Sequence, residues 1–201
     1  MMTIHDVEQK SNEWLALRRQ YPLTASEALA IKTGGKGLET LVWNKLAELY
    51  SSGEAAQFSN DDTERGNDSE PTARVIYELE TGATVQEVGF VTNDEISTVG
   101  GASPDGLVGE EGLWEGKAFG DAKHFRMIVE GIEIENKYME QMQMQMLFTG
   151  RKWCDFSSYN PNFSPSLLTT RVHADEEMQK EIIEGLKKGE ELIKEIKSKV
   201  K

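Results

Sequence analysis

Two carboxylates and an ammonium group near the middle of the chain have the spacing for divalent-metal chemistry. Asp105 lies in a Ser-Pro-Asp-Gly turn, and Glu115 and Lys117 follow on a strand-like run. Residues two apart on a strand project to the same face, so a hairpin would place all three side chains in one pocket. Mg²⁺ prefers oxygen ligands and is often held by one or two carboxylates and a substrate phosphate. A nearby lysine can orient or help to deprotonate the attacking water, so the pattern indicates metal-assisted attack on a phosphate.

The arrangement of these residues resembles the motif of the PD-(D/E)XK nuclease superfamily. Pro104-Asp105 is followed after nine residues by Glu115-Gly116-Lys117. Pro-Asp-Gly turns and Glu-x-Lys pairs are common on exposed hairpins, so the spacing by itself also fits an ordinary turn. The motifs elsewhere in the chain favour the nuclease interpretation.

Five motifs occur in order within residues 11–160. They are Trp14 with Arg18 and Thr24-Ala25-Ser26; Gly66 to Glu70 with Ala73-Arg74 and Tyr77; Ser103-Pro104-Asp105-Gly106-Leu107; Glu115-x-Lys117; and Tyr138-Met139-x-Gln141-x-Gln143. In these residues and this order, the chain resembles the phage lambda exonuclease (YqaJ-type viral recombinase) family. The resemblance covers most of the chain.

The resemblance implies a metal site. In the family the acidic residues of the central motif bind the catalytic Mg²⁺, which corresponds here to Asp105 and Glu115. The backbone carbonyl of Gly116 would be a further ligand, and Glu70 would help to hold a second ion. Lys117 corresponds to the catalytic lysine. Mn²⁺ also accepts oxygen-rich sites, so its substitution for Mg²⁺ is left open.

The resemblance also implies an active-site glutamine. Gln143 matches it, and Gln141 is a second candidate beside it. This chain departs from the family at Gly116, where a larger apolar residue is usual, and after the lysine, where Cys-Pro often follows and this chain has Ala118-Phe119-Gly120. Glycine weakens a strand locally, but it keeps the carbonyl ligand.

A pocket for the 5′-terminal phosphate of DNA is the third implied feature. Its residues here would be Arg18, Ser26 and Ser103. A guanidinium binds phosphate through two hydrogen bonds, and hydroxyls donate further ones. Arg19 is an alternative to Arg18, because the interval from Arg18 to Ser26 is slightly longer than the family's.

The implied function is processive 5′→3′ degradation of double-stranded DNA from a 5′-phosphorylated end, which leaves 3′ single-stranded overhangs. The resemblance further implies a homotrimeric ring around the DNA and a single-strand annealing protein as partner in phage recombination. The gene would belong to a phage or prophage, and the protein would act in the bacterial cytoplasm. A PD-(D/E)XK endonuclease and a catalytically inactive DNA-end-binding protein are the alternatives.

Apolar periodicity and capping residues, together with the methionine content of residues 138–148, predict six helices around these motifs. They cover residues 11–19, a segment opened by Thr24 or Ser26 as cap, a segment from 38, then 71–80, 138–148 and 182–200. The glycine-rich residues 32–37 and the polar residues 51–60 are expected to be loops. Alternating Gln and Met within 138–148 also fits a strand period.

Strand-like runs are predicted at residues 83–91, 99–102, 112–119 and 153–159. The first three, separated by turns, indicate a small meander. Helices before and after such a meander predict an α/β (α+β) fold. With the resemblance, the expectation is one PD-(D/E)XK exonuclease domain over residues 1–201, with a small central mixed sheet flanked by helices.

The net charge of −13 is unusual for a DNA-binding protein, because phosphates are contacted by Lys and Arg. Residues 54–95 hold eleven acidic and two basic residues, so the negative charge is concentrated in one segment. The lone Cys154 excludes an internal disulfide and fits a reducing compartment. The sequence contains no membrane-spanning run and no secretory signal, which predicts a cytoplasmic protein.

Overall fold

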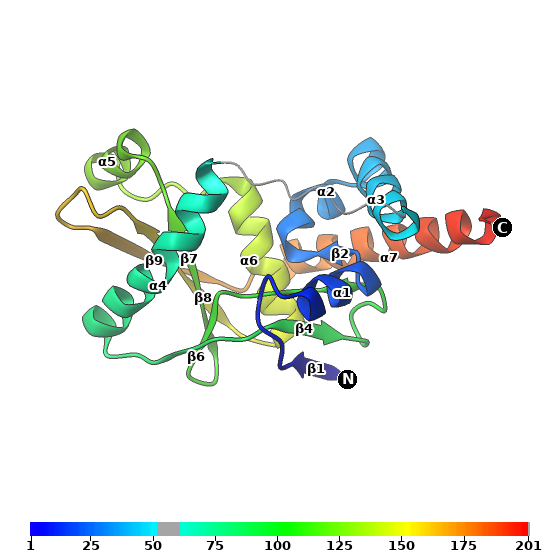
Figure 1. Ribbon diagram of the computed structural model, residues 1–201, viewed down its shortest axis with the longest axis horizontal. Helices are drawn as coiled ribbons and strands as arrows, with labels where there is room; N and C mark the ends of the chain where they lie inside the picture. The colour runs from blue at the N-terminus through cyan, green and yellow to red at the C-terminus, as the bar shows by residue number, and fades with distance from the viewer. Residues whose placement is uncertain (52–60, 201) are drawn as a thin grey trace.

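A mixed five-stranded sheet lies at the centre of the computed structural model, which describes residues 1–51 and 61–200. Its strands, in spatial order, are β3 (Val85–Gln86), β6 (Gly106–Val108), β7 (Gly112–Ala118), β8 (Trp153–Tyr159) and β9 (Leu167–His173). β7 and β8 are parallel, and the other neighbours are antiparallel. The predicted small mixed sheet flanked by helices is therefore confirmed (Figure 1).

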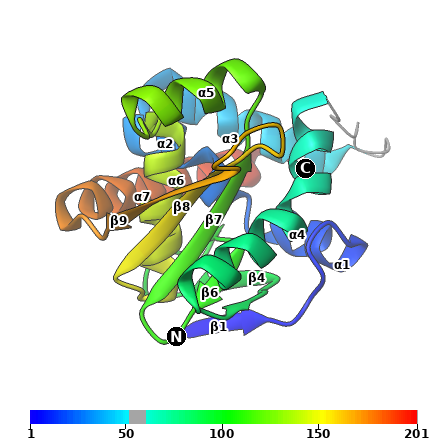
Figure 2. The same ribbon diagram turned by 90° about the vertical axis from the view of Figure 1, so that its left-hand side faces the viewer.

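Two helices cover opposite faces of this sheet: α4 (Asp61–Thr81) and α6 (Asn136–Thr149). Figure 2 shows them on either side of β7 and β8. Alternate residues of β7 point to the two helices. Leu113 packs in an apolar cluster with methionines of α6, whereas Trp114 packs in another cluster with Tyr77 of α4. By the same alternation, Glu115 and Lys117 face the α6 side.

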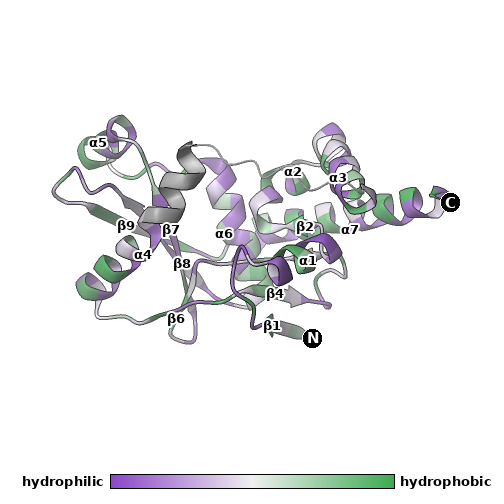
Figure 3. Cartoon of the chain, in the orientation of Figure 1, coloured by the Kyte–Doolittle hydropathy of each residue, from purple (hydrophilic) through white to green (hydrophobic). Residues whose placement is uncertain are grey.

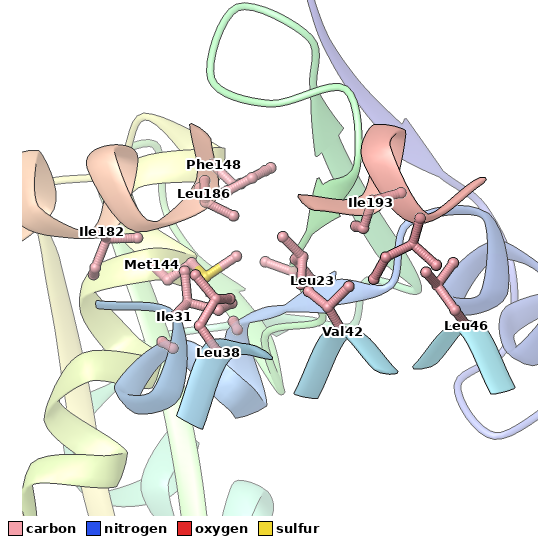
Figure 4. Packing of buried hydrophobic residues seen from close by; sticks show 14 residues of the cluster. Leu23, Ile31, Leu38, Val42, Leu46, Met144, Phe148, Ile182, Leu186 and Ile193 are labelled. Carbon is pink, nitrogen blue, oxygen red and sulfur yellow. The ribbon is translucent and has the colours of Figure 1, made fainter. Parts of the chain in front are cut away.

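A helical layer lies beside the sheet and forms its own apolar core (Figures 1 and 4). Its helices are α1 (Asn12–Gln20), α2 (Ala28–Thr33), α3 (Gly35–Tyr50) and α7 (Glu176–Lys199). Gly185 of α7 lets Ile31 of α2 pack closely on this helix. A Cβ atom at position 185 would lie 2.1 Å from the Ile31 carbonyl oxygen, so a larger residue would not fit. The predicted amphipathic helix at the end of the chain is confirmed as α7, whose polar and apolar residues alternate along its length (Figure 3).

Two short strand pairs connect the N-terminal segment to the centre of the chain. β1 (Met2–His5) pairs antiparallel with β4 (Phe90–Asn93), and β2 (Leu23–Thr24) pairs parallel with β5 (Gly100–Gly101). A short 3₁₀ turn, η1 (Ala25–Glu27), follows β2. The β2–β5 pair brings the Thr-Ala-Ser motif next to the segment that leads to Asp105.

The predicted loop at residues 32–37 is wrong. α2 continues to Thr33, and α3 begins at Gly35. Gly34 has φ 69°, a conformation that glycine adopts without strain, so one residue is enough to redirect the chain between two helices. The expected loop at 51–60 lies, beyond Ser51, outside the described residues.

The predicted helix start at Pro71 is also wrong, because α4 begins at Asp61 and Pro71 lies inside it. A proline removes one helical hydrogen bond but does not force a helix to begin. The predicted meander is wrong in its middle run, since β5 pairs with β2 and not within the central sheet. β1, β9 and α5 (Asp121–Glu130) were not predicted. Within residues 1–51 and 61–200, no helix is long and apolar enough to span a bilayer.

Candidate active site

The β6–β7 hairpin brings the central motif together. Gly106 pairs with Trp114 in the antiparallel register, which places Asp105 opposite Glu115. The backbone N–H of Gly116 donates a hydrogen bond of 2.9 Å to Asp105 Oδ2. Strand pairing and strand alternation together thus bring the two carboxylates and the ammonium group side by side, as the spacing predicts.

Glu115 is fully buried and is held by three donors. Its Oε1 accepts a hydrogen bond of 2.6 Å from Gln141 Nε2 and lies 2.5 Å from Lys117 Nζ. Its Oε2 accepts a hydrogen bond of 2.8 Å from Gln145 Nε2. A buried carboxylate needs such partners, and these three fix its orientation.

The expectation that Gln143 faces the active site is wrong. Its Nε2 donates to the carbonyl oxygen of His173, and its Oε1 accepts from the backbone N–H of Asp175, each at 2.8 Å. Residues four apart share a helix face, whereas residues two apart do not. Gln141 and Gln145 therefore reach Glu115 together, and Gln143 points elsewhere. Gln145 was not predicted, although its interval of four from Gln141 is the signal that marks it.

The carboxylates and Lys117 perturb one another strongly. Burial raises the pKa of Asp105 well above its usual range, the charges of Glu115 and Glu70 raise it further, and Lys117 opposes them. Burial alone would lower the pKa of Lys117, but Glu115 and Asp105 outweigh it and raise the pKa above its ordinary value. The positive charge of Lys117 therefore offsets part of the repulsion between the two carboxylates.

These residues fit an oxygen-seeking divalent cation. Asp105 and Glu115 supply carboxylate oxygens, and in the described part of the chain the buried Oε1 of Gln145 has no hydrogen-bond partner. Among the side chains that the structure describes, those of residues 1–51 and 69–200, no three His, Cys, Asp or Glu are close enough to hold a metal by themselves. A cation would thus complete its coordination with the Gly116 carbonyl, water or substrate oxygens.

Glu70 is near enough to this centre for its charge to raise the pKa of Asp105. Its Oε2 lies 4.0 Å from Lys10 Nζ. Lys10 has φ 70°, a left-handed conformation that strains non-glycine residues. The preceding Gln9 donates hydrogen bonds of 2.8 Å to the Val88 carbonyl and 2.9 Å to the Pro104 carbonyl, and so anchors this turn beside Asp105.

Trp114 explains the glycine in the Glu-Gly-Lys motif. A Cβ atom at position 116 would lie 2.6 Å from the Trp114 ring, which is itself fully buried and hydrogen-bonded to Ser157. The indole fills the space that a larger residue would need at position 116. The departure from the family pattern is therefore a packing exchange that leaves the Gly116 carbonyl in place.

The expected phosphate-pocket residues lie together around Trp14. Arg18 Nη2 donates to Ser26 Oγ at 3.3 Å and to Thr24 Oγ1 at 3.0 Å, and the Arg18 guanidinium lies 4.5 Å above the Trp14 ring. The Trp14 indole donates a hydrogen bond of 2.8 Å to Ser103 Oγ. Arg18 thus contacts Ser26 directly and is linked to Ser103 through Trp14. Arg19, the alternative, is exposed on α1.

The chain is similar to a known family and to solved exonuclease structures. The profile of the YqaJ-like viral recombinase domain matches residues 13–152. The chain belongs to this family. This chain shares 34% sequence identity with LHK-Exo, an alkaline exonuclease from Laribacter hongkongensis. The TM-score is 0.77 for each of two crystal structures of LHK-Exo, one of which is a complex with dAMP. The matches cover 94% of this chain and 97% of LHK-Exo.

A phage-related exonuclease from Haemophilus somnus 129PT has the same fold. It is 15% identical, with a TM-score of 0.65 over 88% of this chain and 95% of its own. No curated protein matches the chain. The family resemblance and the fold predicted from the sequence are therefore confirmed.

Two charged residues near Arg18 were not predicted in this YqaJ-like domain. Glu27 follows the Thr-Ala-Ser motif, and Lys45 lies on α3, 3.0 Å from the Glu27 carboxylate. Burial raises the pKa of Glu27, but Lys45, the Thr24 hydroxyl and Arg18 together lower it below its ordinary value. Burial lowers the pKa of Arg18, and the charge of Glu27 offsets part of this effect. No sequence motif marks Lys45, because it reaches the pocket from another helix.

Proposed function

We propose that this protein is a Mg²⁺-dependent exonuclease that degrades the 5′-phosphorylated strand of linear double-stranded DNA in the 5′→3′ direction. The observation that carries the proposal is the adjacency of the two sites. Ser103 accepts a hydrogen bond from the Trp14 indole beneath Arg18, and Asp105 is two residues further along the chain. A terminal phosphate held by Arg18, Ser26 and Ser103 would bring the next ester to the carboxylates. The dAMP complex of LHK-Exo, a mononucleotide complex, supports this proposal.

Each residue around Asp105 and Glu115 would have its own role in this reaction. Asp105, Glu115 and the Gly116 carbonyl would hold Mg²⁺, and Mn²⁺ has the same oxygen preference. The bound ion supplies a Lewis acid that makes water a better nucleophile and stabilises charge on phosphate oxygens. Lys117 would donate a hydrogen bond that orients the attacking water or stabilises charge on a phosphate oxygen. Glu70 would contribute to a second ion once it is released from Lys10.

Gln141 and Gln145 keep the Glu115 carboxylate in one orientation. Positioned groups of this kind lower the barrier because they need no reorganisation during the reaction. The proposed assembly is a homotrimeric ring around the duplex, which would make degradation processive. The 3′ single-stranded product would pass to a single-strand annealing protein in a bacterial host cell.

A duplex with a 5′-phosphate at one end and a 5′-hydroxyl at the other, with each strand labelled, tests the proposal. With Mg²⁺, the wild type should release mononucleotides from the phosphorylated end. Lys117→Ala should slow release by about 100-fold or more, as expected for loss of a positioned acid–base or charge-stabilising group. Arg18→Ala should lose the preference between the ends while it keeps residual hydrolysis.

Lys152→Ala is the matched control, because Lys152 is 70% exposed and pairs with Glu111 at the opposite end of β7. It should degrade the duplex as the wild type does. Equal cutting of a covalently closed circle would instead identify an endonuclease. Binding of ends without any metal-dependent hydrolysis would identify an inactive end-binding protein.

A further inference from the structure

The residues expected to bind the terminal phosphate, Arg18, Ser26 and Ser103, are called the Arg18 pocket below. This pocket already contains an anion, the carboxylate of Glu27. Glu27 Oε2 accepts hydrogen bonds from the hydroxyls of Thr24 and, at 3.1 Å, Ser26. Its Oε1 lies 3.0 Å from Lys45 Nζ and 3.9 Å from Arg18 Nη2. Two cations and two hydroxyls around one anion are the same kinds of donor that a phosphate group needs.

The three charged side chains are largely enclosed, each with 21% of its surface exposed. Arg18 and Lys45 carry two positive charges and Glu27 carries one negative charge. Glu27 therefore reduces the net charge of these three side chains from +2 to +1 before any ligand binds. A ligand cannot use the full charge of Arg18 unless it draws the guanidinium away from Glu27.

Competition between Glu27 and a ligand also follows from the hydroxyl groups. A serine hydroxyl has one proton to donate. Ser26 Oγ accepts from Arg18 and donates to Glu27, so its proton is used internally. An incoming phosphate must take this donor from the carboxylate.

Anions differ in how well they compete. A phosphodiester carries one negative charge, as the Glu27 carboxylate does, and gains little by replacing it. A phosphomonoester carries about −1.5 to −2 at pH 7 and offers three acceptor oxygens. Its larger charge can draw Arg18 and Ser26 toward it, while Lys45 remains beside Glu27 as its counter-ion.

We infer that Glu27, held by Lys45, is a specificity-determining residue that makes the Arg18 pocket select a doubly charged terminal phosphate over a singly charged phosphodiester. This inference rests on the proposed function, because it assigns a selection step to the same 5′-phosphate pocket. Glu27 thereby excludes internal phosphates of the DNA backbone from a pocket meant for a strand end.

Three duplexes that differ only in the 5′ group test the inference: a phosphate, a methyl phosphate diester and a hydroxyl. Their binding to the full-length protein is measured by fluorescence anisotropy with Ca²⁺ in place of Mg²⁺. The wild type should bind the phosphate about tenfold more tightly than the methyl phosphate, as one or two charged hydrogen bonds allow. Glu27→Gln should remove most of this preference by raising the affinity for the methyl phosphate.

Lys45→Gln tests the second half of the inference and does not depend on how well Glu27→Gln folds. Without Lys45, the Glu27 carboxylate pairs with Arg18 alone. The affinity for the phosphate end should then fall about tenfold, with little change for the hydroxyl end. Unchanged binding of the phosphate end by Lys45→Gln would overturn the part assigned to Lys45.

Glu48→Gln is the matched control, since the exposed Glu48 acts on Arg18 through its charge alone. It should keep the wild-type preference. A Glu27→Gln variant that binds the phosphate less tightly, without a gain for the methyl phosphate, would show a purely structural role and overturn the inference. If the wild type itself binds all three ends alike, the phosphate pocket of the proposed function fails as well. If the wild type discriminates and Glu27→Gln discriminates equally, only the inference fails.

Discussion

The carboxylate centre and the Arg18 pocket satisfy their buried charges in opposite ways. Asp105 and Glu115 lie side by side, and Lys117 pairs with Glu115, so two formal negative charges face one positive charge. In the pocket, Glu27 lies between Arg18 and Lys45. The first site needs a cation from outside, whereas the second supplies its own counter-ion.

This difference predicts how the stability of each site should change when one of its carboxylates is neutralised. Neutralising a carboxylate in the first site relieves repulsion, but neutralising the carboxylate in the second leaves cations unpaired. Ligands should also act differently. A metal ion adds to what the carboxylate centre already has, whereas a terminal phosphate must compete with Glu27.

The largest expected effect is that of Asp105→Asn at the carboxylate centre. Because the pKa of Asp105 is raised, its ionised form is disfavoured in the metal-free fold, and the amide should raise the free energy of unfolding of that fold at pH 7. The same change should abolish stabilisation by Mg²⁺ and reduce hydrolysis by about 100-fold or more. Thermal unfolding in EDTA and in Mg²⁺ measures both effects. A variant less stable than the wild type in EDTA would contradict the charge excess.

Glu27→Gln should have the opposite sign and a smaller size. At pH 7 it should lower the free energy of unfolding by about 1 kcal/mol, as a charged hydrogen-bonded group is replaced by a neutral one. The pKa of Glu27 is lowered by folding, so its stabilisation is present above the unfolded pKa and is lost as pH falls through the folded value. The difference between variant and wild type should therefore shrink in acid. Urea unfolding at neutral and acidic pH measures it, and a constant difference would argue against an ionic role.

Lys10→Gly should have the smallest effect on stability. It tests whether Lys10 competes with a metal ion for Glu70. Glycine relieves the left-handed strain at φ 70°, but it loses more backbone entropy on folding, so it should raise stability by only about 0.5 kcal/mol. Lys10→Met keeps the strain and removes the charge that faces Glu70. If the two variants change the response to Mg²⁺ equally, the charge of Lys10 is what competes for Glu70. If neither does, this ion pair has no effect on metal binding.

Local patterns in the sequence determined most of the carboxylate centre. Asp105, Glu115 and Lys117 are brought together by one hairpin, and strand alternation sets which side chains share a face. The helices at 11–19 and 182–200 follow from apolar periodicity in the same local way, whereas the helix at 138–148 follows from its methionine content, since its alternating Gln and Met residues also fit a strand. The positions of these helices depend on short stretches of sequence, so they can be predicted without distant contacts, although the last helix begins earlier, at Glu176.

Only the tertiary structure decided which side chains complete each site. Gln141 and Gln145, and not Gln143, reach Glu115 because α6 presents that face to β7. Lys45 reaches Glu27 because α3 folds back beside α1, and Ser103 reaches Trp14 because β5 pairs with β2. These contacts join residues far apart in the chain, and their energies depend on how helices and sheet pack. Residue types and local spacing therefore specified the chemistry, and long-range packing specified the partners.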